Sequence, residues 1–139
     1  MIFFISCKKQ AGTNIYSVID LSVLDANGKN LLAVPAVFHQ DNIQVFYVIK
    51  GKPTLISNYD VPDHGVSYFL IDSDKATKMR LTLHNDKRES QSLTLVKFGN
   101  LQTDTIRCEF HYEGSNVALT RLWINGIEKN HHETLTLVK

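Results

Sequence analysis

The polar loop between residues 58 and 65 carries the side chains best suited to contact a ligand, namely Tyr59, Asp60, Asp63 and His64. An exposed tyrosine ring offers a stacking surface to a sugar, and loop carboxylates beside a histidine can hydrogen-bond a ligand or hold a hard cation weakly. Loops of this composition are more often simply solvated. We therefore treat these four residues as candidate ligand contacts and predict no metal site among them.

The six histidines lack the spacing of a metal site. His131 and His132 are adjacent, and successive residues of a strand point to opposite faces, so on a strand they cannot chelate together. His84 and His111 fall at outward positions of two different strands. We predict neither a metal nor any other cofactor.

The sequence shows no catalytic signature. It has no Gly-x-Ser-x-Gly elbow, no glycine-rich phosphate loop and no pair of carboxylates at a recognisable spacing. The segment 25–30 resembles the start of a calcium loop, but Ala36 stands where the bidentate glutamate belongs. We predict a protein that is not an enzyme. A hydrolase or metal enzyme with an unrecognised site is the remaining catalytic alternative.

Composition and charge describe an ordinary globular domain. The 139 residues suit one domain, and they are 43% hydrophobic and 21% charged. Because 15 Lys and Arg oppose 14 Asp and Glu, the formal net charge is +1. This balance gives no reason to expect a nucleic-acid partner.

Cys7 follows a short apolar run that ends in a small residue, as in the lipobox of a bacterial lipoprotein signal peptide. Ile5 and Ser6 precede the cysteine, and Phe4 stands where leucine is usual. We expect residues 1–6 to be the remnant of a signal peptide, residues 7–14 to be the lipidated cysteine and a flexible linker, and residues 15–139 to be the folded domain. The alternative is that the run begins a first strand and Cys7 is an ordinary residue.

Alternation of apolar and polar residues predicts about nine short strands, separated by turn signals about ten residues apart. In the strand expected over 16–24, Ile19, Leu21 and Val23 form the core face. Cys108 occupies an inward position of the strand expected over 104–112, so it reads as a small buried hydrophobe with a raised pKa. The pattern predicts an all-β, antiparallel β-sandwich, immunoglobulin-like or a related Greek key, with a barrel as the alternative.

Four short motifs occur together along the chain: Ser6-Cys7-Lys8-Lys9, residues 25–32, residues 43–47 followed by Gly51-Lys52, and residues 122–126. With them the chain resembles the small uncharacterised lipoproteins that are abundant in Bacteroidetes. The resemblance implies a β-sandwich lipoprotein, and it supplies no catalytic residues. In such lipoproteins an acidic run after the cysteine looks like a signal for export to the outer face. Because Lys8-Lys9 stands there instead, we expect a lipid anchor in the outer membrane that faces the periplasm.

These observations lead to three functional hypotheses. The first is a non-catalytic cell-envelope lipoprotein that is bound to the membrane by its lipid and that binds or scaffolds another envelope component. The second is a glycan-binding module of a nutrient-uptake system, and the third is the enzyme named above. A large apolar patch would favour a protein partner, and an exposed aromatic cluster with convergent polar groups would favour a glycan.

Overall fold

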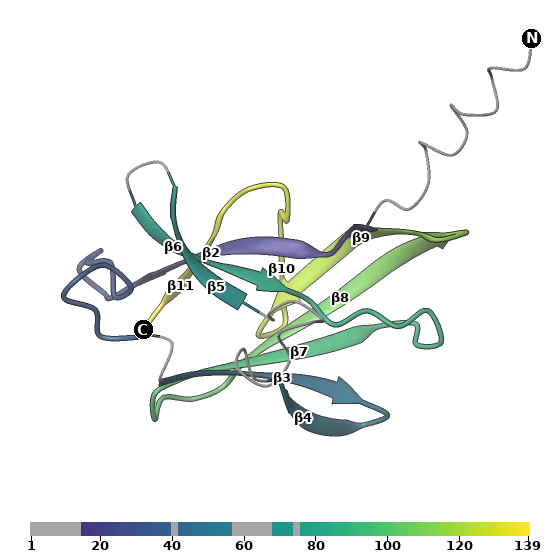
Figure 1. Cartoon of the computed structure of the whole chain (residues 1–139), viewed down its shortest axis with the longest axis horizontal. Helices are drawn as coiled ribbons and strands as arrows, with labels where there is room; N and C mark the ends of the chain where they lie inside the picture. Colours follow the sequence, from purple (N-terminus) through teal and green to yellow (C-terminus); the bar gives the residue numbers. More distant parts are fainter. Residues whose placement is uncertain (1–14, 40–41, 57–67, 74–75) are drawn as a thin grey trace, which may run out of the picture.

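The computed structural model describes residues 15–39, 42–56, 68–73 and 76–139, which form two β-sheets packed face to face (Figure 1). The larger sheet has the strand order β1-β9-β8-β7-β3-β4, and β10 also pairs with β9. Its strands are β1 (Ile15–Tyr16), β3 (Ile43–Ile49), β4 (Lys52–Ile56), β7 (Ser92–Phe98), β8 (Asp104–Glu113), β9 (Asn116–Ile124) and β10 (Ile127–Lys129).

The smaller sheet has the strand order β11-β2-β6-β5. Its strands are β2 (Val18–Leu24), β5 (Tyr68–Ser73), β6 (Ala76–Thr82) and β11 (Leu135–Val138). The predicted all-β sandwich is confirmed. The described chain has eleven strands instead of nine, because β1 and β10 span only two and three residues and are too short to show alternation. Within the described ranges, no helix has the length and hydrophobicity of a membrane span.

Most strand pairs of the described chain are antiparallel, as predicted, but two are parallel, so both sheets are mixed. β1 runs parallel to β9, and β11 runs parallel to β2. Parallel neighbours need a long connection between them, and each of these pairs joins strands from distant parts of the chain. The alternation that predicted the strands carries no information about which strands pair.

The chain passes from one sheet to the other at Ser17, between β1 and β2. Ser17 is buried, and its carbonyl accepts a hydrogen bond from the backbone N–H of Leu83 at 2.8 Å. This crossing brings Tyr16 at the edge of the larger sheet next to the first residues of β2. It thereby places side chains from both sheets around one opening.

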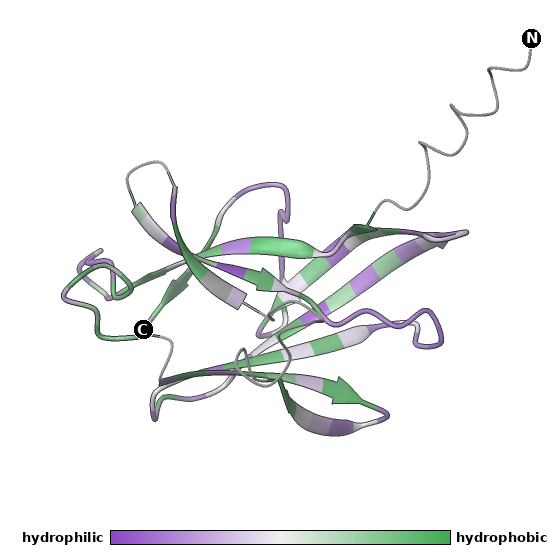
Figure 2. Cartoon of the chain, viewed as in Figure 1, coloured by the Kyte–Doolittle hydropathy of each residue, from purple (hydrophilic) through white to green (hydrophobic). Residues whose placement is uncertain are grey.

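The core lies between the two sheets, where the inward side chains of both meet. The smaller sheet contributes the predicted face of Ile19, Leu21 and Val23, all at most 3% exposed. Along β8, Ile106 and Cys108 are fully buried, as the alternation predicts. The hydropathy of the strands alternates along their length accordingly (Figure 2).

Two tight hairpins fix the register of the larger sheet. Lys50-Gly51 joins β3 to β4, and Asn125-Gly126 joins β9 to β10. All four residues have positive φ, from 51° to 87°. Two-residue turns of this kind match the twist of the flanking strands, which is why Asn-Gly and X-Gly pairs are such strong turn signals.

Candidate functional site

The residues singled out as ligand contacts, Tyr59, Asp60, Asp63 and His64, lie outside the described residues, and so does Cys7. Two other regions of the described chain have the character of binding sites. One is a pocket at the crossing between the sheets, and the other is the outer face of the larger sheet.

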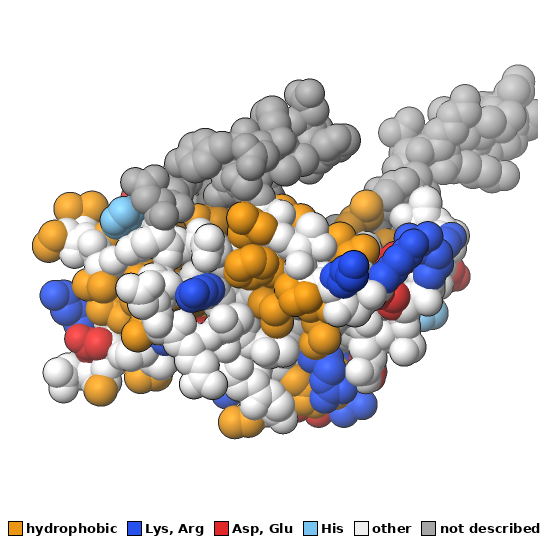
Figure 3. Space-filling view, turned by 90° about the horizontal axis from the view of Figure 1, so that it is seen from below, with side chains coloured by type: hydrophobic (Ala, Val, Ile, Leu, Met, Phe, Trp, Pro, Cys, Tyr) orange, Lys and Arg blue, Asp and Glu red, His pale blue; other side chains and the backbone are white. Residues whose placement is uncertain are grey.

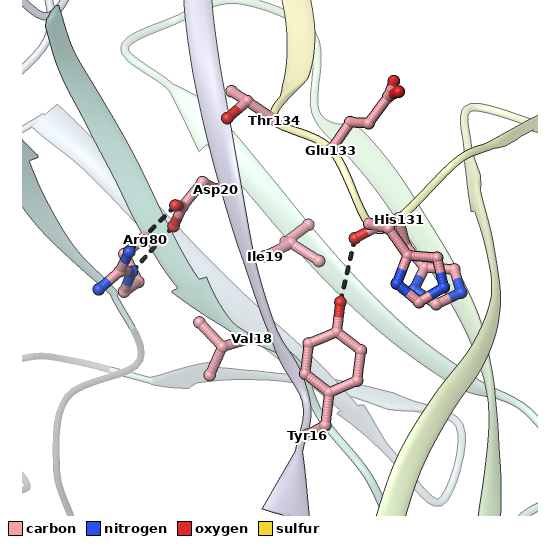
Figure 4. Close-up of a pocket in the computed structure, with 9 residues that line it drawn as sticks. Tyr16, Val18, Ile19, Asp20, Arg80, His131, Glu133 and Thr134 are labelled. Carbon is pink, nitrogen blue, oxygen red and sulfur yellow. Dashed lines mark hydrogen bonds and ion pairs between the residues drawn. The ribbon is translucent and has the colours of Figure 1, made fainter. Parts of the chain in front are cut away.

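The first region, the crossing pocket, encloses about 470 Å³ and opens to solvent. It lies between β2 and the turn 130–134 that leads into β11, with one wall from β6 (Figure 4). Its polar and aromatic side chains are Tyr16, Asp20, Arg80, His131, His132 and Glu133.

The turn 130–134 is held against β1 and β9 by hydrogen bonds. The Tyr16 hydroxyl donates to the carbonyl of His131 at 3.1 Å. The ring of His132 lies nearly parallel to that of Tyr16, at 11° with centroids 6.3 Å apart, and the centroids of His131 and His132 are 4.1 Å apart. The two histidines lie in a turn and not on a strand, so their rings do not point to opposite faces of a sheet. Both residues line the crossing pocket.

The opposite wall of the pocket is an ion pair across two strands. Asp20 and Arg80 are direct neighbours in the β2–β6 register. The guanidinium donates two hydrogen bonds to the carboxylate, at 2.9 and 3.1 Å, which is the bidentate geometry that such pairs favour. Both side chains remain partly exposed, and the carboxylate raises the pKa of Arg80 by hydrogen bonding and by its charge.

Of the two ring nitrogens of His131, Nε2 has a hydrogen-bond partner and Nδ1 has none among the described residues. Its Nε2 lies 3.1 Å from the carbonyl oxygen of Thr120. A carbonyl only accepts, so Nε2 carries the proton. Burial lowers the pKa of His131, which favours the neutral ring, and in that ring Nδ1 is an acceptor. Within the described structure this buried Nδ1 has no hydrogen-bond partner.

The second region is an apolar patch on the outer face of the larger sheet, made of Phe46, Val48, Leu55, Leu93 and Leu95. The buried residues of β3 and β7 alternate with these side chains, so the patch residues point away from the core. Phe46 is the direct neighbour of Leu55 on one side and of Leu95 on the other. Figure 3 shows hydrophobic side chains gathered across this face, with Lys and Arg beside them.

Basic side chains flank the apolar patch. The guanidinium carbon of Arg107 lies 4.1 Å from the ring centroid of Trp123, and that of Arg121 lies at 4.6 Å. These two cations cover the indole, which is only 9% exposed. Arg121 is also paired with Glu128 at 2.9 Å. Arg107 has no carboxylate within ion-pair distance in the described part of the chain.

A hollow of about 440 Å³ adjoins the patch, bounded by Val48 and Leu93 on one side and by the segment 88–91 on the other. The segment is braced by Arg88, which donates to the carboxylate of Asp86 at 2.8 and 3.0 Å. This contact lowers the pKa of Asp86 to about 2.

His84 corrects one expectation, since it was placed on the wet face of its strand. It is 9% exposed, its ring stacks on Tyr47 with centroids 5.1 Å apart, and its Nε2 lies 3.3 Å from Glu89. The loop after β6 folds over it, and the alternation within β6 could not show that. His111 is exposed, as expected.

Sequence patterns alone missed the crossing pocket. Asp20 and Arg80 are visible as opposite charges at outward positions of two expected strands, but only the pairing of β2 with β6 makes them neighbours. Comparisons with models of protein families, with curated proteins and with solved structures gave no match. No group of three or more metal-ligating side chains occurs within the described ranges.

Proposed function

We propose that this protein is a non-catalytic lipoprotein of the bacterial cell envelope whose domain binds another envelope protein through the apolar patch. The patch is the observation that supports the proposal. The outward face of an antiparallel sheet usually carries polar residues, whereas here Phe46, Leu55 and Leu95 adjoin across three strands. Contiguous apolar side chains on a surface mark contact sites for other proteins.

The charges around the patch indicate the chemistry of the partner. Arg107 and Lys97 face outward on the same sheet, and neither has a carboxylate partner within the described structure. The nearby carboxylate of Glu109 already accepts a hydrogen bond from Gln91 at 2.9 Å. A partner surface with an apolar centre and carboxylates at its rim complements this face, whereas a second copy would bring like charges together.

The lipobox supports attachment to a membrane. In this proposal Cys7 carries the lipid, residues 8–14 form the linker, and Lys8-Lys9 directs the domain to the periplasmic side of the outer membrane. Fractionation of native host cells tests the anchor. We expect the wild type in the membrane fraction, with a lipid-modified cysteine as its first residue by mass spectrometry, and Cys7→Ser in the soluble envelope extract.

Cys108→Ala is the matched control for the anchor, since it removes the other cysteine of the chain and should stay in the membrane fraction. Retention of Cys7→Ser in the membrane, or an unmodified Met1, contradicts the anchor.

The partner is tested by photo-crosslinking in cells. A photoreactive amino acid replaces Leu55, which is 52% exposed in the patch, or Val138, which is 65% exposed on the smaller sheet. We expect the Leu55 position to give one discrete adduct with an envelope protein, identified by mass spectrometry, and the Val138 position not to give it. An adduct of the chain with itself overturns the proposed partner.

Binding between the two purified proteins then provides the quantitative test. Leu55→Glu and Arg107→Glu place negative charge where carboxylates of the partner are expected, so each should weaken the Kd by at least about tenfold. Val138→Glu should leave the Kd unchanged. Equal affinity of Leu55→Glu and wild type contradicts docking on the patch.

A further inference from the structure

The crossing pocket has a different chemistry from the apolar patch and lies on a different part of the sandwich. Its volume of about 470 Å³ is within the range of small-molecule sites. Its walls come from both sheets and from the turn 130–134, so its shape is set by the packing of the whole domain (Figure 4). A ligand of this pocket would be distinct from the protein partner proposed above.

One wall of the crossing pocket offers donors and acceptors with no net charge. Asp20 and Arg80 neutralise each other through their bidentate contact. A guanidinium has five N–H donors and a carboxylate has about four acceptor positions, so each retains groups for a ligand. Neighbouring hydroxyl groups, which both donate and accept, match such a donor–acceptor pair.

The opposite wall disfavours an anion. The pocket lining on this side includes His132 and Glu133, both of which are exposed. Glu133 adds an exposed carboxylate at the same opening. A phosphate, sulfate or carboxylate group would meet this carboxylate, whereas a hydroxyl group can donate to it.

The third component is a pair of rings. Tyr16 and His132 lie nearly parallel, and the tyrosine hydroxyl is held by the carbonyl of His131. A ring held in this way loses little conformational freedom when a ligand contacts it. Aromatic rings bind the apolar C–H faces of sugars while polar neighbours bind their hydroxyl groups.

We propose that the crossing pocket binds one neutral sugar residue, a hexose or an N-acetylhexosamine, either free or as part of a glycan. Its hydroxyl groups hydrogen-bond Asp20, Arg80 and Glu133, and its apolar face lies on the rings of Tyr16 and His132.

The test is an NMR titration of the full-length protein with glucose, galactose, mannose and N-acetylglucosamine, and with oligosaccharides of each. At least one should give saturable shifts in the side-chain signals of Tyr16, His131 and His132. A Kd near 1 mM, equivalent to about −4 kcal/mol, is expected for one sugar residue. Tighter binding of the oligosaccharide identifies a glycan chain as the ligand, and equal binding identifies a single residue.

Matched substitutions separate the pocket from the rest of the surface. Asp20→Asn and His132→Ala should weaken the Kd by about tenfold or more. Asp72→Asn is the control for Asp20→Asn, because Asp72 is an exposed residue of the same sheet. His111→Ala is the control for His132→Ala, because His111 is an exposed histidine outside the pocket. Both control variants should bind the sugar as the wild type does. The proposal is overturned if no sugar of the panel saturates, if the pocket variants bind normally, or if only glucuronic acid or Zn²⁺ gives saturable shifts.

Discussion

The ammonium group of Lys139 forms an ion pair with the carboxylate of Asp104, and both side chains are about nine-tenths buried. The second carboxylate oxygen of Asp104 accepts a hydrogen bond from Asn125 at 2.9 Å. The pair joins the residue after β11 to the start of β8, and so it links the two sheets at one end of the sandwich. It stands apart from both candidate binding sites.

Breaking this pair should destabilise the domain strongly. Lys139→Met leaves the Asp104 carboxylate buried without its cation, which should lower the free energy of unfolding by about 3 kcal/mol. Replacing both residues, as Lys139→Met with Asp104→Leu, removes the unpaired charge and should recover much of the loss. Urea unfolding of the three proteins measures this. If Lys139→Met is as stable as the wild type, the ion pair contributes nothing to the free energy of unfolding.

The turn between β3 and β4 offers a stabilising substitution. Lys50 has a φ of 51°, a left-handed conformation that costs a non-glycine residue roughly 1–2 kcal/mol and that asparagine tolerates better. Lys50→Asn should therefore raise the free energy of unfolding by up to about 1 kcal/mol. Lys52→Asn removes the same charge from a strand position and should not stabilise. A Lys50→Asn protein no more stable than wild type would contradict the reasoning.

Cys108 should be unreactive in the folded protein. Burial raises the pKa of its thiol to about 12, an effect only partly offset by the neighbouring Ser92 side chain. At pH 8 the reactive thiolate is therefore almost absent. In a Cys7→Ser background, a thiol reagent should label no cysteine in native buffer and one cysteine in 6 M guanidinium, a denaturing concentration for nearly all domains. Rapid labelling of the native protein would disprove burial of this thiol.

Trp123 is the single tryptophan of the chain and reports on the basic groups beside the patch. Arg107→Ala uncovers one face of the indole, so its fluorescence should shift to longer wavelength and be quenched more readily by acrylamide. Loss of this cation–π contact should cost about 0.5–1 kcal/mol of folding free energy. Lys97→Ala is the control, because it removes a cation from the same face of the sheet and leaves the cation–π contacts of Trp123 intact. Identical spectra for the two variants would argue against the contact.

The stability of the domain should fall in mild acid because of His131. Burial, together with the neighbouring His132, lowers the pKa of His131 below its ordinary value of 6.5. The unfolded chain then binds the proton first, so the stabilisation is present above pH 6.5 and is lost as the pH falls through the lowered pKa. Urea midpoints at pH 7.5 and 5 should differ less in His131→Asn than in the wild type, whereas exposed His111→Ala should behave as the wild type. An NMR titration that gives His131 an ordinary or raised pKa would refute this.

Local features of the sequence determined the fold class. Alternation along 16–24 and 104–112 identifies strands with one buried face, because a period of two places every second side chain against the core. Asn125-Gly126 marks a hairpin because its two residues accept positive φ. These signals lie within a few residues of each other, so they can be read from the chain without knowledge of its packing.

Only the tertiary structure decided which side chains meet. Tyr16 and His131 are 115 residues apart and become neighbours through the parallel pairing of β1 with β9 and of β11 with β2. The same holds for Asp20 and Arg80, which share a face only because β2 pairs with β6. Alternation states which side of a strand is buried, but not which strand lies beside it. Both candidate sites are therefore products of strand order, a non-local property that the sequence patterns do not encode.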